Sequence, residues 1–170
     1  NRINWRYSVG GNIPYSWTNV VADSTEAPSN TPCSRRLSNG NVGFAYARYT
    51  SGSTDHMIFV SSTTVDGSSG WSNVQIEATS GYKSFSTNGM VIMSNGNPGV
   101  IFRRSNISDI YWSYSNQSDG AAGWQAIVAV ATHGSDIYMS PSVTVLSNGN
   151  LGVAYQKQNT ELLYAYSTTV

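Results

Sequence analysis

The sequence predicts an all-β protein built from repeats, and three observations carry this prediction. The phrase Ser-Asn-Gly-Asn, preceded by Leu or Met, occurs three times, and its glycines Gly40, Gly96 and Gly149 lie 56 and then 53 residues apart. Apolar-rich runs flank each copy, as expected where two strands meet at an Asn-Gly turn. No segment combines helical periodicity with a capping residue. A period of this length is typical of solenoids, propellers and arrays.

Two strands and a loop are predicted before the first turn. Residues 3–8 alternate apolar and polar side chains with period two, which indicates a strand, and a second strand is predicted at 19–22. Pro28 and Pro32 lie in the segment 23–32, which therefore predicts a loop.

From Cys33 onward the strands recur regularly, four to a full repeat. The predicted strands are 35–38, 42–46, 57–61 and 74–78, then 90–93, 100–103, 110–115 and 125–131, and finally 143–146, 152–155 and 162–167. Four short antiparallel strands per repeat is the blade of a β-propeller. Each Asn-Gly pair is expected to form a two-residue type I′ turn, and the three turns should share one face.

We therefore predict one propeller segment, 1–170, with two full blades inside it. The expected division is a partial blade at 1–33, blades at 34–86 and 87–138, and a partial blade at 139–170. Propellers close with about four to eight blades, and three repeats would leave open sheet edges. The chain is therefore expected either to form a homo-oligomeric ring or to belong with the remaining blades of a longer chain, and we favour the second.

Aligned repeats show which positions the architecture needs. An apolar residue followed two positions later by an aromatic one predicts a packing layer in the core, without a ligand role. These pairs are Ile3 and Trp5, Met57 and Phe59, Ile110 and Trp112, and Leu162 and Tyr164. Recurring strand glycines mark close approach by a neighbour. We expect Trp71 and Trp124 to be buried between blades against Gly99 and Gly152.

The composition excludes several classes of partner. The formal net charge is zero and only 11% of the residues are charged, which argues against nucleic acid and against an anionic membrane surface. No apolar run approaches the length of a membrane-spanning helix. A surface of Ser, Thr, Asn, Gly and Tyr suits a secreted or cell-surface protein. Asn106 and Asn116 fit the N-glycosylation pattern, and the single Cys33 excludes an internal disulfide.

Two glycine-rich stretches suggest a family. Asp66-Gly-Ser-Ser-Gly-Trp71 and Asp119-Gly-Ala-Ala-Gly-Trp124 resemble the Asp-box, or BNR repeat, of sialidase-like β-propellers, Ser-x-Asp-x-Gly-x-x-Trp. In that family the box is a structural turn between the third and fourth strands of a blade, away from the active site. Propeller lectins of bacteria and fungi are also similar.

The match to the box is degenerate at two positions. Thr64 and Gln117 stand where the box has its leading Ser, and Ser68 and Ala121 stand where it has its middle Gly. The resemblance therefore depends on the spacing from Asp to Trp together with the blade-length period.

In a propeller of this topology, the loops between the second and third strands share one face with the connections between blades. Most of the ionisable residues fall there, whereas Asp66 and Asp119 fall on the opposite face; loops also simply tolerate charge. The residues assigned to the loop face are Glu26, Arg48, Asp55, His56, Lys83, Arg103, Arg104, Asp109, His133, Asp136, Lys157 and Glu161.

A glycan or another polar ligand would be bound on this loop face. Arginines offer planar forks for carboxylates or hydroxyl pairs, and tyrosines offer stacking surfaces with a polar tip. The expected contacts are Arg48, Tyr49, Tyr82, Arg103, Arg104 and Tyr138. Arg103 and Arg104 are consecutive in a strand and point to opposite faces, so at most one of them can contact a given ligand. The other should cover a blade or pair with a loop carboxylate.

The resemblance to sialidases also implies a catalytic set that this chain does not match. Those enzymes use an arginine cluster, a tyrosine nucleophile assisted by a glutamate, and an aspartate acid/base. No Arg follows Pro32 or Pro141 at the expected place, where Cys33 and Ser142 stand instead. One of the neighbouring arginines Arg35 and Arg36 is expected to face the central channel. No catalytic residue is assigned.

Cofactor and thiol chemistry are not expected either. His56 and His133 lack the clustered ligands of a zinc site, so no metal or cofactor is expected. Nearby cations could lower the pKa of Cys33 and make it reactive, but a packed thiol is favoured.

Three functions remain open. The first is an extracellular recognition module for a glycan or polar ligand, without chemistry of its own. The second is a fragment of a sialidase-like glycoside hydrolase whose other blades carry the catalytic residues. The third is a structural or adhesive module of a filament or fibre.

Overall fold

The computed structural model describes residues 3–8, 17–24, 27–28, 32–50, 54–80, 85–104, 108–132, 134, 138–158 and 160–169. For residues 3–8, 17, 27–28, 49–50, 54–55, 78–80 and 85–88 it describes the backbone alone. Asn106, Tyr82 and His133 lie outside the described residues.

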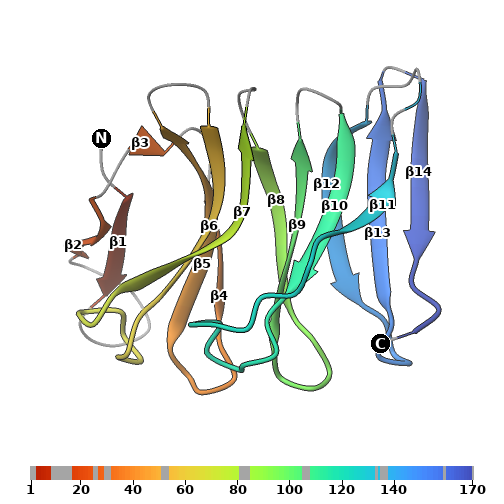
Figure 1. Cartoon of the computed structure of the whole chain (residues 1–170). Helices are drawn as coiled ribbons and strands as arrows, with labels where there is room; N and C mark the ends of the chain where they lie inside the picture. Colours follow the sequence, from red (N-terminus) through yellow and green to blue (C-terminus); the bar gives the residue numbers. More distant parts are fainter. Residues whose placement is uncertain are drawn as a thin grey trace.

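Antiparallel sheets stand side by side in chain order (Figure 1). The first sheet contains β1 (Ile3–Ser8) and β2 (Trp17–Asp23). The second contains β3 (Ala27–Pro28), β4 (Cys33–Arg36), β5 (Val42–Thr50), β6 (Thr54–Ser61) and β7 (Ser72–Ser80). The third contains β8 (Phe85–Ile92), β9 (Pro98–Arg104), β10 (Asp109–Tyr114) and β11 (Val128–Ala131). The fourth contains β12 (Tyr138–Val145), β13 (Leu151–Lys157) and β14 (Glu161–Tyr166).

The predicted fold class, all-β with four-stranded antiparallel blades, is confirmed. None of the described residues is helical, so none of them forms a helix that could cross a membrane. The repeat includes a shift in strand register at the same place in the first three sheets. The shift occurs just after Ile3, Met57 and Ile110. β1 and β2 therefore correspond to β6 and β7, and to β10 and β11. This correspondence identifies equivalent residues in different sheets.

The Asn-Gly turns lie at one common end of the sheets, as predicted (Figure 1). The predicted type I′ geometry, however, is wrong. Gly40 has φ +87° and Asn39 is not among the residues with positive φ, although a type I′ turn needs positive φ at both. The Gly40 amide donates to the Leu37 carbonyl at 2.9 Å, and the Leu37 amide donates to the Asn41 carbonyl at 2.8 Å. These bonds define a three-residue loop, a type I turn followed by a glycine bulge.

The asparagine of each turn has a different role from the one expected. The side-chain oxygen of Asn39 accepts a hydrogen bond from the Asn41 amide at 3.0 Å, and the same bond recurs in the other two turns. The amide group therefore stabilises the bulge, while only the glycine adopts the left-handed conformation.

The core lies between neighbouring sheets. Between the second and third sheets it consists of Leu37, Ala45, Ala47, Met57, Phe59, Met90, Val100 and Phe102. Between the third and fourth sheets it consists of Val91, Met93, Ile101, Ile110, Trp112, Val143 and Val153. Between the first and second sheets it consists of Ala22 of β2 with Phe44, Tyr46, Ile58 and Val60 of the second sheet. The second and third sheets therefore each contribute one face to each of two cores, whereas the first and fourth each contribute to one.

The predicted packing layer is confirmed in two repeats and wrong in the last. Met57, Phe59, Ile110 and Trp112 are buried, whereas the equivalent Leu162 and Tyr164 are 82% and 59% exposed. No described sheet follows the fourth one, so none of the described residues covers this side of β14. The side chains of Ile3 and Trp5 lie outside the described residues.

The expected neighbours of the strand glycines are also corrected. A Cβ atom at Gly99 would lie 2.0 Å from the Trp112 ring, and one at Gly152 would lie 2.5 Å from the Tyr164 hydroxyl. Each glycine thus makes room for an aromatic side chain of the adjacent strand in its own sheet. Trp124 is half-buried and instead packs against Phe59, with tilted rings whose centroids lie 5.1 Å apart.

Trp71 is half-buried as well. It packs against Phe44, with ring centroids 5.3 Å apart, and so joins the core that faces the first sheet. Both tryptophans therefore lie at sheet interfaces, but not against the glycines that the sequence suggested.

The two glycine-rich turns share the same internal bonds. Asp66 Oδ1 accepts from the Ser68 amide and Asp119 Oδ1 from the Ala121 amide, both at 2.9 Å. The indole nitrogen of each tryptophan donates to a glycine carbonyl within its turn, at 3.1 and 2.8 Å. The indole is therefore fixed by the turn that precedes it.

A serine that the sequence comparison missed closes each turn. Ser62 Oγ accepts from the Thr64 amide and donates to the Ser69 carbonyl. Ser115 Oγ makes the same two bonds, with the Gln117 amide and the Ala122 carbonyl. The hydroxyl common to both turns thus comes from a serine two positions before Thr64 and Gln117, the residues that the resemblance aligned with the leading Ser of the box. In the first turn Thr64 Oγ1 also accepts from the Ser69 amide at 3.3 Å.

Candidate ligand-binding site at the loop end

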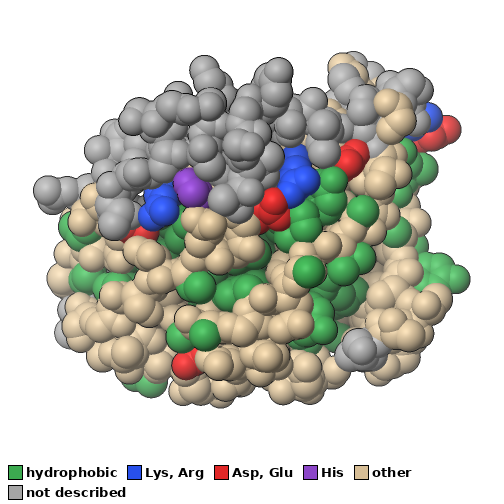
Figure 2. Space-filling view, in the orientation of Figure 1, with side chains coloured by type: hydrophobic (Ala, Val, Ile, Leu, Met, Phe, Trp, Pro, Cys, Tyr) green, Lys and Arg blue, Asp and Glu red, His purple; other side chains and the backbone are tan. Residues whose placement is uncertain are grey.

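The ends of β5, β9 and β13 and the starts of β6, β10 and β14 lie at the end opposite the Asn-Gly turns, which we call the loop end (Figure 1). In the view of Figure 2 the Lys, Arg and His side chains gather towards this loop end, and an isolated acidic group lies near the other end. The predicted ligand-binding residues that the structure describes belong to this end, so the candidate site is built from here.

A cation occurs at the same place in three sheets, near the loop end of the second strand, opposite the start of the third. The cross-strand pairs are Arg48 with His56, Arg104 with Asp109, and Lys157 with Glu161. Lys157 Nζ and Glu161 Oε2 lie 4.0 Å apart in an exposed pair. The other two arginines are drawn into interfaces between sheets.

Arg104 joins the third sheet to the second. Its guanidinium forms an ion pair with Glu77 of β7 and lies over the Tyr111 ring, 4.5 Å from the centroid. The Arg104 and Glu77 side chains are 18% and 12% exposed, so water screens the pair only partly. Tyr111 then donates from its hydroxyl to Asp109 Oδ2 at 2.9 Å. Four side chains from three strands are thus committed to one network.

An equivalent network joins the second sheet to the first. Asp23, the register equivalent of Glu77, is buried and accepts from the Tyr46 hydroxyl at 2.6 Å and from Asn73 Nδ2 at 3.2 Å. Arg48 lies close enough to favour the ionised form of the Tyr46 hydroxyl. The pattern of an acid on an outer strand facing a cation of the next sheet therefore occurs twice.

The surroundings of Tyr46 and Tyr111 keep both hydroxyl groups protonated, so that they act as hydrogen-bond donors. Burial, followed by the hydrogen bond to Asp23, raises the pKa of Tyr46, and burial with the bond to Asp109 raises the pKa of Tyr111. Both hydroxyls therefore stay protonated at neutral pH and continue to donate to their carboxylates. The two networks behave as structural clasps between sheets.

Arg103 lies on the opposite side of β9 from Arg104, as strand alternation requires. Ile101, two positions earlier on the same face of β9, belongs to the core shared with the fourth sheet. Its Nη2 donates to Ser108 Oγ at 3.2 Å, and its buried Nε has no hydrogen-bond partner among the described residues. Burial lowers the pKa of Arg103, but an arginine side chain stays protonated in proteins. This half-buried cation is therefore incompletely paired within the described structure.

Tyr138 lies at the same interface between the third and fourth sheets. Its ring meets that of Tyr155 edge to face, with centroids 5.4 Å apart. Both rings pack against the core shared by these two sheets. Burial, together with the neighbouring Tyr138, raises the pKa of Tyr155. The pair offers partly exposed aromatic surface with hydroxyl groups.

The structure does not bring together the four predicted residues whose side chains it describes. Arg48 and Arg104 belong to the two clasps, whereas Arg103 and Tyr138 belong to the next interface along. The carboxylate that pairs with Arg104 comes from strand β7 rather than from a loop. Tyr49 is described only by its backbone in β5, and Tyr82 lies outside the described residues.

Sequence reasoning missed the partners that decide these roles. They are Asp23, Glu77, Tyr111, Asp109 and Tyr155. The strand register carries the signal that could have found Asp23 and Glu77, because both stand opposite the bulge that repeats in each sheet.

Other chemistry finds little support in the described residues. Burial raises the pKa of Cys33 to about 11, so the hypothesis of a thiol activated by nearby cations is wrong. No cluster of three or more His, Cys, Asp or Glu side chains suited to a metal occurs in the described part of the chain. Arg35 and Arg36 are exposed, and Arg36 Nε donates to the Gly40 carbonyl at 3.3 Å, towards the turn end.

Comparison with known proteins gives a fold likeness alone. No family model and no curated protein matches the sequence. The NanB sialidase of Streptococcus pneumoniae, in complex with 2-[(3-chlorobenzyl)ammonio]ethanesulfonate, superposes with a TM-score of 0.57 at 16% identity, over 96% of this chain and 26% of the sialidase. A point mutant of NanB gives 0.54 at 16% identity, over 95% and 26%.

A leech intramolecular trans-sialidase complexed with 2,7-anhydro-Neu5Ac gives a TM-score of 0.45 at 17% identity, over 90% of this chain and 25% of that one. The chain thus spans about a quarter of the length of the sialidases it resembles. The likeness to NanB shows that the sheets have the arrangement of a sialidase-like β-propeller.

Proposed function

We propose that this chain is part of a secreted or cell-surface sialidase-like β-propeller and that it recognises an acidic or otherwise polar glycan at the loop end. The observation that carries the proposal is Arg103. Its guanidinium is half-buried at the interface of the third and fourth sheets, and among the described residues only the Ser108 hydroxyl accepts from it. A partly desolvated arginine binds a carboxylate more strongly than one in water.

The tyrosines near Arg103 would contact the part of a sugar that the guanidinium does not bind. Tyr138 and Tyr155 belong to the same interface as Arg103 and combine ring surface with hydroxyl groups. Arg48 and Arg104 are not part of this proposed site, because their partners already hold them between sheets. Of the four expected contacts whose side chains the structure describes, we therefore keep Arg103 and Tyr138, and we add Tyr155. Tyr49 and Tyr82 remain expected contacts.

The class of glycan is proposed from the fold likeness. NanB is named a sialidase, so an acidic sugar is the first ligand to test. The repeated bonds within the two glycine-rich turns support assigning these turns to the Asp-box type. Other blades, from the same chain or from further copies, would complete the propeller.

A second candidate is a segment of a glycoside hydrolase whose catalytic residues lie in other blades. The observation that favours it is the extent of the match, because the chain covers only 26% of NanB. In this case too, the role of this segment would be to bind and position the glycan, since no catalytic residue is assigned to it.

The test compares two arginines at opposite ends of the sheets. Arg103→Ala should weaken binding of a sialylated oligosaccharide by about tenfold or more, which corresponds to one charged hydrogen bond. Arg36→Ala removes the same charge at the turn end and should leave binding unchanged. Binding is measured by calorimetry after circular dichroism has shown that both variants are folded. Equal affinities of the two variants would refute the proposed site.

A further inference from the structure

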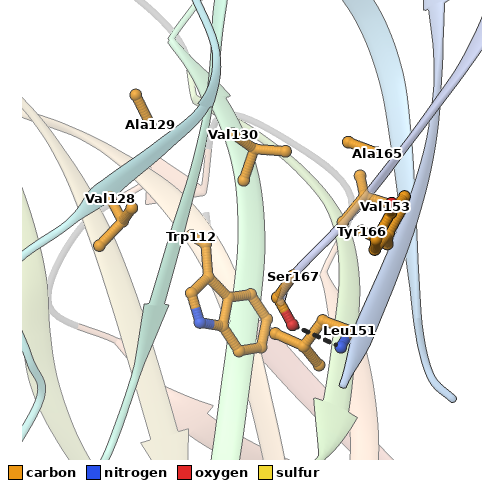
Figure 3. Close-up of a pocket in the computed structure, with 9 residues that line it drawn as sticks. All are labelled: Trp112, Val128, Ala129, Val130, Leu151, Val153, Ala165, Tyr166 and Ser167. Carbon is orange, nitrogen blue, oxygen red and sulfur yellow. Dashed lines mark hydrogen bonds between the residues drawn. The ribbon is translucent and has the colours of Figure 1, made fainter. Parts of the chain in front are cut away.

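An apolar groove lies between β11 of the third sheet and β14, the edge strand of the fourth (Figure 3). Its volume is about 240 Å³, and its lining residues are Trp112, Val128, Ala129, Val130, Leu151, Val153, Ala165, Tyr166 and Ser167. An adjoining hollow of about 330 Å³ shares Trp112, Val128, Leu151 and Ser167, and extends to Asn95 and Gly149 of two Asn-Gly turns. The two hollows form one continuous depression towards the turn end.

The repeat shows what fills the same place one interface earlier, between the second and third sheets. Trp112 pairs across its sheet with Val128 as Phe59 pairs with Val74. Leu151 and Pro98 each directly precede the glycine of a second strand. The equivalent lining residues are Phe59 for Trp112, Val74 for Val128, Ile76 for Val130, Pro98 for Leu151, Val100 for Val153 and Ser115 for Ser167.

In that earlier interface the depression is filled by a tryptophan and its turn. Trp124 packs against Phe59 with ring centroids 5.1 Å apart and the ring planes tilted by 51°. Gly120 of the same turn is pressed so closely that a Cβ atom there would lie 2.4 Å from the Phe59 ring and 3.0 Å from Pro98. The indole occupies the position equivalent to the first hollow, and the glycine turn occupies the position equivalent to the second.

The segment that contains Trp124 also forms backbone hydrogen bonds at the edge of β10. Ser115 forms a bridge with Trp124, and the Gln125 amide donates to the Tyr114 carbonyl at 2.8 Å. In the fourth sheet the equivalents of Tyr114 and Ser115 are Tyr166 and Ser167, and no described strand lies beyond β14. The edge and the groove are therefore open together.

The hydroxyl of Ser167 reflects this difference. Ser115 Oγ donates to the Ala122 carbonyl of the glycine-rich turn at 2.6 Å. Ser167 Oγ instead accepts from the Leu151 amide at 2.9 Å (Figure 3). Ser167 thus occupies the position from which Ser115 closes its glycine-rich turn, and its hydroxyl is placed to close another turn of this type.

We propose that this groove and the edge of β14 together bind a β-strand segment that carries a tryptophan directly after a Gly-x-x-Gly turn. The segment would add to β14 as a fourth strand, place its indole on Trp112 and set the glycine turn against Leu151. This surface is separate from the loop-end site, so the proposal stands whether or not the chain binds a glycan.

The experiment uses the intact chain and a synthetic peptide with the sequence of residues 115–131, which contains such a turn, tryptophan and strand. A peptide of the same sequence with Trp124→Ala is the control. We expect the first peptide to bind at least about tenfold more tightly than the control, because a buried aromatic anchor dominates such contacts. Hydrogen exchange should show new protection of the β14 amides. Equal binding of the two peptides, or protection elsewhere than β14, would overturn the proposal.

Two exposed apolar residues give matched variants of the chain. Val128 lines the groove and is 57% exposed, while Leu162 is exposed on the other side of β14. Val128→Glu should abolish peptide binding and Leu162→Glu should leave it within about twofold, since neither exposed position is needed for folding. Native mass spectrometry of the chain alone tests a rival occupant. Self-association that Val128→Glu removes but that the peptide does not compete away would identify a different surface of a second copy in the groove, and the proposal would fail.

Discussion

Arg104 shows why a cation at the loop end of this fold is not by itself a ligand site. Strand alternation predicted correctly that Arg103 and Arg104 go to opposite sides, because side-chain direction is a local property of the strand. Alternation could not predict what each side chain meets. Glu77 lies 27 residues away on a different sheet, and only the packing of the sheets brings it to Arg104.

The first prediction concerns this ion pair. Glu77→Ala should lower the free energy of unfolding by about 3 kcal/mol, because it leaves the largely buried Arg104 without its carboxylate. Arg104→Ala and the double variant complete a mutant cycle, followed by urea denaturation. The coupling energy should exceed about 1 kcal/mol. A value below about 0.5 kcal/mol, typical of exposed pairs, would show that the clasp does not hold the sheets together.

At the scale of the elements, the repeated phrase predicted where the turns occur but not their geometry. An Asn-Gly pair between apolar runs favours a two-residue turn, and the sequence offers no local reason to prefer a longer loop. The bond from Leu37 to Asn41 adds Ser38 to the loop, and this places Asn39 in the ordinary right-handed region. The turn type is thus decided by the register of the flanking strands.

The prediction that the aligned glycines contact tryptophans of another blade was wrong for a similar reason. A glycine that recurs in a strand does signal close approach, but the pattern does not say from which side. Gly99 and Gly152 meet aromatic side chains of the next strand in the same sheet, whereas the sequence suggested a tryptophan from another blade. The repeat predicted where the aromatic residues occur in the sequence. Which glycine each aromatic side chain contacts could be seen only in the structure.

The second prediction follows from the turn geometry. Gly40→Ala should cost about 1–2 kcal/mol, since an alanine at φ +87° is strained while the space around it is ordinary. Asn39→Ala should cost less, about 0.5–1 kcal/mol, because only one exposed hydrogen bond is lost. Thermal unfolding of the two variants measures the difference. Equal costs would favour the two-residue turn that the sequence first suggested.

At the scale of the whole molecule, the sequence predicted a propeller segment because a period with four strands determines how sheets must pack. It could not predict which repeats would be covered. Met57 and Ile110 are buried by the sheet that follows each of them, and Leu162, at the same place in the repeat, is exposed. Burial in this fold is a property of the neighbouring sheet as much as of the residue.

The third prediction tests that statement with equivalent aromatic residues. Phe59→Ala should lower the free energy of unfolding by about 3–5 kcal/mol, because Phe59 is fully buried between the second and third sheets under Trp124. Tyr164→Ala removes the equivalent side chain of the fourth sheet, which is largely exposed, and should cost less than about 1 kcal/mol. Urea denaturation of both variants at one protein concentration measures the two costs.

The contrast should disappear when a further strand covers the fourth sheet. The side of β14 that carries Tyr164 corresponds to the side of β6 that carries Phe59, so a following blade would bury Tyr164 as the third sheet buries Phe59. In that assembly Tyr164→Ala should become as costly as Phe59→Ala. Similar costs in the chain alone would mean that its fourth sheet is already covered in solution, and the arrangement of open and closed faces described above would be wrong.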